Sequence, residues 1–133
     1  MSVRREASCR CGLLTAVAIG EPVRVSVCHC MNCKRRSGSA FSYNATLAKE
    51  KVVTSGASTR FSHSQEGGYW GELSFCPTCG STVTYEIERR PGMVTIPAGA
   101  FADSAFREPT VSVYGERRHA WCVLQTNGPL EEA

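Results

Sequence analysis

Hydrophobic and polar residues alternate over many short stretches of this chain. In residues 23–28 the valines occupy every second position, and Arg24, Ser26 and Cys28 take the positions between them. A period of two is typical of a strand with one buried face, so Cys28 is expected to leave its strand on the side away from the valines. Further strands are predicted at residues 13–19, 41–47, 52–54, 59–62, 69–75, 82–88, 93–96 and 110–114.

Glycine, proline and small polar residues separate these stretches. Turns are expected at residues 20–22, 65–68 and 89–92, and a single helical turn at residues 32–36 is expected to end at Gly38. No amphipathic helical pattern extends over ten residues or more. The pattern therefore predicts a mainly β fold of several short, coiled antiparallel sheets with little helix. It is expected to form one domain over residues 1–133 with a frayed C-terminal tail.

Charge and hydropathy exclude several classes of function. Lys and Arg number 15 against 12 Asp and Glu, which gives a net charge of +3. The basic residues form short pairs and triplets, such as residues 34–36, and not a dense stripe with aromatics, so no nucleic-acid partner is expected. No apolar run approaches the ~20 residues of a membrane span, and no secretory signal is visible. A cytoplasmic location is therefore expected.

Eight cysteines are more than a chain of this length needs for packing. In a reducing compartment, clustered cysteines are more often metal ligands than disulfides. Seven of them form three groups, namely Cys9-x-Cys11, Cys28-x-Cys30-x-x-Cys33 and Cys76-x-x-Cys79-Gly80. In an extended segment residues i and i+2 point to the same side, so Cys9 and Cys11 can face one ion. A tight CxxCG turn likewise brings Cys76 and Cys79 to one ion.

Two pairings of these groups are compatible with zinc, which takes four protein ligands in a structural site and three in a site with an open position. The first joins Cys9 and Cys11 to the pair at 76 and 79, and leaves the group at 28–33 for a second ion. The second is a zinc ribbon formed by Cys30 and Cys33 with the pair at 76 and 79. Spacing favours the first pairing and leaves the second open.

The remaining soft ligands are interpreted as structural. Cys122 stands alone between Trp121 and Val123, which is more typical of a small buried residue than of a fourth zinc ligand. His29 alternates with Cys28 and Cys30, so its ring is expected to point away from the ion that they share.

Taken together, the motifs resemble those of a known family. They are Cys9-x-Cys11-Gly12, Cys28-His29-Cys30-x-x-Cys33 continuing to Arg35-x-Ser37-Gly38, and Phe75-Cys76-x-x-Cys79-Gly80-Ser81. In this order they resemble the glutathione-dependent formaldehyde-activating enzymes (GFA), a family that includes relatives of centromere protein V. The resemblance covers about residues 6–125.

This resemblance implies a Mss4-like, β-rich fold with two zinc ions per chain. A structural zinc would be held by Cys9, Cys11, Cys76 and Cys79, and a second zinc by Cys28, Cys30 and Cys33. The implied activity is addition of glutathione to formaldehyde, which gives S-hydroxymethylglutathione, or the reverse carbon-sulfur lyase reaction. Members of the family often carry a histidine at the place held here by Ser112.

Charge favours a thiol as the fourth partner of the second zinc. Three thiolates on Zn²⁺ leave a net charge of −1, so activation of water is less natural there than at a zinc held by neutral histidines. The predicted catalytic residues are therefore Cys28, Cys30 and Cys33. The basic triplet Lys34, Arg35 and Arg36 follows directly and is predicted to contact the carboxylates of a glutathione-like substrate.

Two other classes of function remain open at this stage. One is a non-catalytic, zinc-stabilised binding module of the Mss4-like type, in which both ions are structural. The other is a redox or metal-storage protein, in which the thiols at 28–33 form disulfides under mild oxidation. The enzyme hypothesis predicts small-molecule partners, namely a thiol such as glutathione and a small aldehyde, and no membrane.

Overall fold

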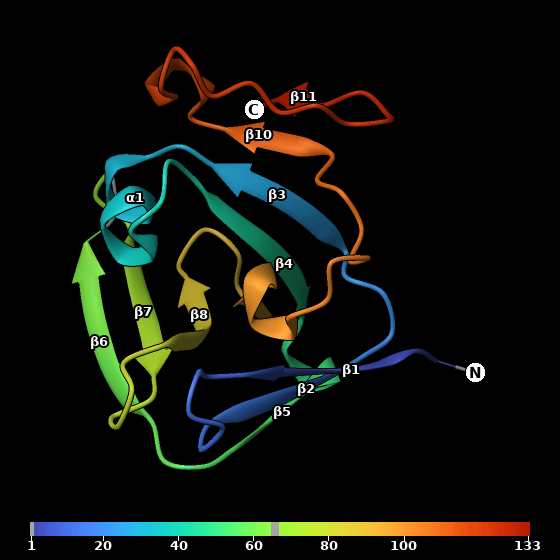
Figure 1. Cartoon of the computed structure of the whole chain (residues 1–133). Coiled ribbons are helices and arrows are strands. Elements are labelled where there is room, and N and C mark those ends of the chain that lie inside the picture. Colours follow the sequence, from blue (N-terminus) through green and yellow to red (C-terminus); the bar gives the residue numbers. More distant parts are fainter. Residues whose placement is uncertain (1, 65–66) are drawn as a thin grey trace.

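Strands dominate the computed structural model, which describes residues 2–64 and 67–133 (Figure 1). The strands are β1 (Arg4–Ser8), β2 (Thr15–Ile19), β3 (Arg24–Cys28), β4 (Ser42–Ala48), β5 (Val52–Ser55), β6 (Thr59–Ser64), β7 (Trp70–Phe75), β8 (Thr82–Ile87), β9 (Met93–Pro97), β10 (Val111–Val113) and β11 (Glu131–Glu132). The helices are α1 (Met31–Ser37) and three short 3₁₀ turns, η1 (Lys49–Lys51), η2 (Ala98–Phe101) and η3 (Gly115–Arg117). The expectation of a mainly β fold with little helix is confirmed.

The strands form two sheets. The smaller one has the order β1-β2-β5, and the larger one has the order β11-β10-β3-β4-β9-β8-β7-β6. In Figure 1 the small sheet lies across the lower end of the large one, and β3 and β4 run side by side through the middle. Most neighbouring strands are antiparallel, whereas β10 pairs in parallel with both β3 and β11.

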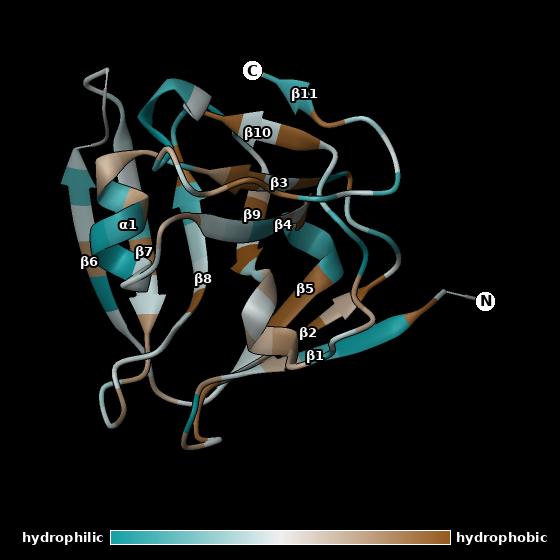
Figure 2. Cartoon of the chain, turned by 45° about the horizontal axis from the view of Figure 1, so that its top comes forward, coloured by the Kyte–Doolittle hydropathy of each residue, from teal (hydrophilic) through white to brown (hydrophobic). Residues whose placement is uncertain are grey.

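The two faces of the large sheet differ in polarity, because side chains alternate along each strand. One face carries Ala45, Leu47, Val83 and Ile96, which pack with residues of the small sheet in the hydrophobic core. The opposite face carries Ser26 and Cys28 on β3 and their partners on β4. Figure 2 shows the hydrophobic colour in β5 and β9 and the hydrophilic colour in β11 and in part of α1. The polar face is thus free to form a site while the apolar face supplies stability.

The helical turn is confirmed as α1. Cys30 caps its N-terminus, and Gly38 ends it in the left-handed conformation (φ 67°), with the Gly38 N–H donating to the Lys34 carbonyl oxygen at 2.8 Å. A glycine adopts this backbone conformation without the strain that a side chain would add. Among the described helices none is long and apolar enough to cross a membrane.

Three elements differ from the expectation. β1 is not apparent from the sequence because it is an edge strand whose polar residues are mostly solvent-accessible, and among its five residues only Ala7 is fully buried. β2 begins at Thr15 and not at Leu13, whose side chain is exposed. The C-terminal residues, expected to fray, form β11 beside β10. Of the turn expected at residues 65–68, Gln65 and Glu66 lie outside the described residues.

Candidate metal centre

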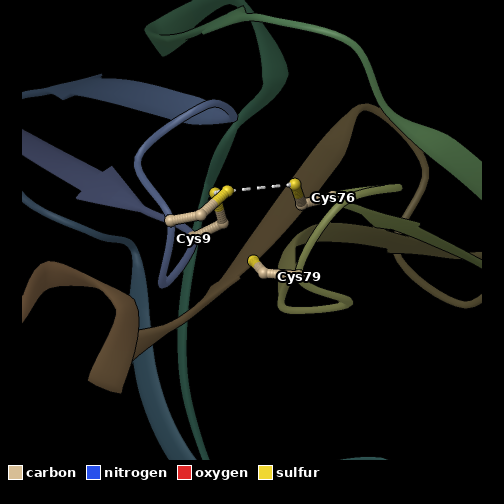
Figure 3. Close-up of side chains that lie close together, drawn as sticks. Cys9, Cys76 and Cys79 are labelled. Carbon is tan, nitrogen blue, oxygen red and sulfur yellow. Dashed lines mark hydrogen bonds between the residues drawn. The ribbon is translucent and has the colours of Figure 1, made fainter.

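Two loops from different sheets bring four cysteines together. Cys9 and Cys11 follow β1, whereas Cys76 and Cys79 follow β7, and their sulfurs all lie within 4.8 Å of one another. Figure 3 shows Cys9 on one loop facing Cys76 and Cys79 on the other. The Cys11 sulfur lies 3.6 Å from both the Cys9 and the Cys76 sulfur. Sulfurs bound tetrahedrally to one zinc at 2.3 Å would lie about 3.8 Å apart, so this four-cysteine cluster fits a single metal ion.

Backbone N–H groups of both loops point at these sulfurs. The Leu14 N–H donates to the Cys9 sulfur at 3.2 Å, and the Thr78 N–H donates to the Cys76 sulfur at 3.4 Å. Hydrogen bonds from the Ser81 hydroxyl and backbone lower the pKa of Cys79 to about 5. Donors of this kind stabilise the thiolate form that a metal ion requires.

The three-cysteine cluster comes from one short segment at the end of β3. Cys28 is the last residue of β3, Cys30 caps α1 and Cys33 lies within α1, with their sulfurs within 4.8 Å of one another. The Cys33 N–H donates to the Cys30 sulfur at 3.3 Å. Hydrogen bonds from the Cys28 and Cys33 thiols hold the pKa of Cys30 far below its usual value. The cluster thus stabilises thiolate at Cys30 by itself.

A cavity of about 970 Å³ opens beside the three-cysteine cluster. All three cysteines line it, and none of the four cysteines of the other cluster does. Its floor is the polar face of the large sheet, represented by Ser26, Asn44, Thr46, Thr95 and Tyr85. This volume lies in the upper part of the range for small-molecule sites.

Arginines dominate the charge of the cavity. Arg24, Arg35, Arg36, Arg89 and Arg90 line it, and Glu116 is the one acidic side chain among its described lining residues. The Arg36 guanidinium lies over the Tyr85 ring, 5.2 Å from the ring centroid, and burial raises the pKa of Tyr85 well above its usual value. The cavity is therefore electropositive and suits an anionic ligand.

The basic triplet is divided by the fold. Arg35 and Arg36 line the cavity, whereas Lys34 is not among its lining residues. The Lys34 ammonium instead donates to the Arg117 carbonyl oxygen at 2.6 Å, which ties α1 to η3. The predicted contact with a substrate carboxylate is therefore compatible with the position of Arg35 and Arg36, but not with that of Lys34.

Other residues lie as their spacing predicts. The sulfurs lie together as in the first pairing, and Cys30 and Cys33 do not share a cluster with Cys76 and Cys79 as the alternative zinc ribbon requires. Cys122 is buried (5% exposed) and belongs to neither cluster. The ring of His29 is also buried and lies 5.7 Å from the Phe41 ring, and it is in neither cluster.

The polar floor of the cavity was not predicted from the sequence. The pattern that could have indicated it lies in residues 41–47, where Ser42, Asn44 and Thr46 alternate with Tyr43 and Ala45. All three alternating polar residues are buried in the structure. In a strand whose polar positions are buried although they alternate with apolar ones, the polar side chains line a cavity and do not form a solvent-exposed surface.

Comparison with known proteins agrees with the motifs. The family model described as "Glutathione-dependent formaldehyde-activating enzyme" matches residues 4–117. The crystal structure of a Rhodobacter sphaeroides protein is similar, with a TM-score of 0.57 and 20% sequence identity over 71% of this chain and 85% of that one. At this identity the likeness concerns the fold alone. No curated protein matches. Because the family match spans most of the chain, the protein belongs to the glutathione-dependent formaldehyde-activating enzyme family.

Proposed function

We propose that the protein forms or cleaves the carbon-sulfur bond between a thiol such as glutathione and a small aldehyde such as formaldehyde, with zinc in both cysteine clusters. One observation carries this proposal. The three-cysteine cluster lines the large cavity, whereas the cavity contains no cysteine of the four-cysteine cluster. Three protein ligands facing a cavity are typical of a reactive zinc site, and four ligands are typical of a structural one.

The residues of the three-cysteine cluster suit zinc. Their donors are sulfur alone, which favours a borderline-soft ion such as zinc, and the Cys33 N–H offsets part of the negative charge on Cys30. A bound zinc would supply an open position for the thiolate of the substrate and would keep that thiol deprotonated near neutral pH. Arg35 and Arg36 lie beside the cluster and compensate the negative charge that a further thiolate brings.

The proposed reaction balances without an oxidant or reductant. The thiolate sulfur of the substrate attacks the carbonyl carbon of the aldehyde, and a carbon-sulfur bond forms as the carbonyl π bond breaks. Water in the cavity supplies a proton to the aldehyde oxygen, which becomes the hydroxyl of the adduct, and the hydroxide that remains takes up the proton that the thiol released when it became a thiolate. In the lyase direction these steps are reversed. The cavity residues hold and orient the thiol, and orientation of this kind lowers the barrier to addition.

Metal-edge X-ray absorption on the purified protein, with and without glutathione, tests the proposal. We expect two zinc ions per chain, one with four sulfur ligands and one with three that gains a fourth on addition of glutathione. Formation of S-hydroxymethylglutathione from glutathione and formaldehyde should be faster than without protein. If both ions have four protein sulfurs and glutathione perturbs neither, the protein is the non-catalytic binding module instead.

A further inference from the structure

The floor of the cavity contains a row of buried polar groups that leads away from the three-cysteine cluster. Cys28 lies opposite Ser42 across β3 and β4, Ser26 lies opposite Asn44, and Arg24 lies opposite Thr46. Residues i and i+2 of a strand share a face, so Arg24, Ser26 and Cys28 form one line on the cavity side. All three line the cavity. The floor therefore presents polar side chains at increasing distances from the three-cysteine cluster.

Some polar groups of this floor bond to each other, whereas the buried amide oxygen of Asn44 does not. The hydroxyls of Thr46 and Thr95 lie 3.1 Å apart and bond to each other. Asn44 is 3% exposed, and its amide nitrogen donates to the Ser42 hydroxyl at 3.0 Å. Its amide oxygen has no hydrogen-bond partner among the described residues. A buried acceptor without a donor is unfavourable, so a donor on a ligand is expected to fill this position.

Arg24 presents the second unmatched group. Its side chain lines the cavity and is half-buried, and within residues 2–64 and 67–133 no carboxylate forms an ion pair with it. A guanidinium in a hollow of reduced polarity attracts a carboxylate more strongly than one on the open surface does. The far end of the floor therefore suits a carboxylate.

The spacing of these groups matches a short peptide. Arg24 and Cys28 are separated by four residues of β3, which correspond to about 13 Å along the strand. Asn44 lies level with Ser26, halfway between them, at about 6.5 Å from the cysteine end. In glutathione the thiol is on the middle residue, and the extended γ-glutamyl arm carries a carboxylate about 10 Å from the sulfur, so the reach of the Arg24 side chain covers the remainder.

We propose that this floor selects the thiol substrate by its peptide part, and that Asn44 and Arg24 are specificity-determining residues. The thiol lies at the three-cysteine cluster, a backbone N–H of the peptide donates to the Asn44 amide oxygen, and a carboxylate pairs with the Arg24 guanidinium. The ligand class is an extended, acidic cysteine-containing peptide of about three residues. This inference rests on the proposed thiol binding at the three-cysteine cluster and adds what holds the rest of the thiol molecule.

Two thiols of different size distinguish binding to the floor from binding to the cluster. Glutathione can reach the cluster, Asn44 and Arg24 together, whereas 2-mercaptoethanol can bind the cluster but is too short to reach Asn44 or Arg24. Calorimetric titration of the zinc-loaded protein with each thiol, under anaerobic conditions, gives the two dissociation constants. The variants are Asn44→Leu, Asn44→Ser and Arg24→Gln. Arg60→Gln is the matched control, because Arg60 lies outside the cavity lining and pairs with Glu72 at 3.5 Å.

We expect Asn44→Leu and Asn44→Ser to weaken glutathione binding by about fivefold and Arg24→Gln to weaken it by about tenfold or more. The dissociation constant of 2-mercaptoethanol should remain unchanged in all of them, which also shows that the cluster is intact. Arg60→Gln should bind both thiols as the unaltered protein does. The effect of Arg24→Gln should shrink as salt concentration rises.

Three contrary results have different meanings. If the Asn44 and Arg24 variants bind glutathione as tightly as the unaltered protein, the floor does not select the peptide and this inference is wrong, while thiol capture at the cluster stands. If the unaltered protein binds neither thiol, the proposed function fails and this inference fails with it. Equal weakening of both thiols in the variants would assign Asn44 and Arg24 to the support of the cluster and would also overturn the inference.

Discussion

The two cysteine clusters contain the same chemical groups but occupy opposite positions in the fold. The four-cysteine cluster joins loops 65 residues apart in sequence, and its Cys9 and Cys76 belong to the hydrophobic core. The three-cysteine cluster is built within six residues, beside the polar face of the large sheet, and lines the cavity. An ion that closes a long loop restricts the unfolded chain much more than one that closes a short loop.

This difference separates stability from function. A metal ion in the four-cysteine cluster would replace core that the small sheet and its loops do not supply alone, because alanines make up much of the packing between the sheets. A metal ion in the three-cysteine cluster would tie only the end of β3 to the start of α1. The same ligand chemistry is therefore expected to have a large effect on folding in one place and a large effect on catalysis in the other.

The largest effect is expected from Cys76→Ser. Cys76 is 1% exposed, and its replacement removes one of the four sulfurs of the cluster and places a hydroxyl in the core. Binding free energies of structural zinc reach about 10 kcal/mol, which is comparable to the whole stability of a domain. The variant should show no cooperative thermal unfolding by circular dichroism. As a control, Cys122→Ser alters a buried thiol outside both clusters and should lose only about 1–2 kcal/mol. Equal losses in the two variants would contradict a special role of the four-cysteine cluster.

Cys30→Ser tests the other half of the comparison. We expect this variant to bind one zinc per chain in place of two, to unfold cooperatively, and to lose S-hydroxymethylglutathione formation by at least about 100-fold. Metal analysis, calorimetry and a rate assay measure these three properties on one sample. A variant that unfolds and binds no metal would show that the three-cysteine cluster is also structural.

Removal of metal by a chelator should separate the clusters in time. The three-cysteine cluster faces the cavity and has one ligand fewer, so it should release its ion first. Activity should disappear with this first ion, while the far-ultraviolet circular dichroism stays unchanged until the second ion leaves. A colorimetric zinc indicator followed together with circular dichroism would record both phases. A single phase in which release and unfolding coincide would refute the separation.

Contacts between residues close in the sequence could be predicted from it, whereas contacts between distant residues could not. Cys28, Cys30 and Cys33 are near neighbours, so their spacing was enough to predict the three-cysteine cluster and the direction of Cys28. The four-cysteine cluster joins two pairs that are 65 residues apart, so spacing favoured it but left the zinc ribbon open. The cavity floor depends on the register between β3, β4 and β9, which joins residues near 26, 44 and 95. Local alternation does not specify that register. β1 was not predicted because four of its five residues are polar and only its alanine is buried, so it shows no alternating pattern.

The basic triplet allows a finer test of which charges serve the cavity. Arg36 lines the cavity and lies over the Tyr85 ring, whereas Lys34 donates to the Arg117 carbonyl oxygen. We expect Arg36→Gln to raise KM for glutathione by about tenfold with little change in kcat, because it removes a charge beside the bound thiol. Lys34→Gln should leave KM unchanged. The reverse order would place Lys34, and not Arg36, at the substrate.

The smallest effect concerns ion pairs that lie away from both clusters. Hydrogen bonds from Arg5 lower the pKa of Glu21, whose carboxylate lies 3.1 Å from Arg5 and 3.6 Å from Arg107. The folded protein therefore binds this proton more weakly than the unfolded chain does. The stabilisation is present above the ordinary carboxyl pKa and is lost as pH falls through the lowered one. Glu21→Gln should thus be slightly less stable than the unaltered protein at neutral pH, with a difference that closes in acid. Thermal unfolding of both proteins from pH 7 to pH 3 would measure it.

Because protons also compete with the metal for the thiolates, both proteins should still lose their zinc and their fold in acid. A large difference in stability between the two proteins that persisted at low pH would instead show that Glu21 contributes stability expected here from the four-cysteine cluster.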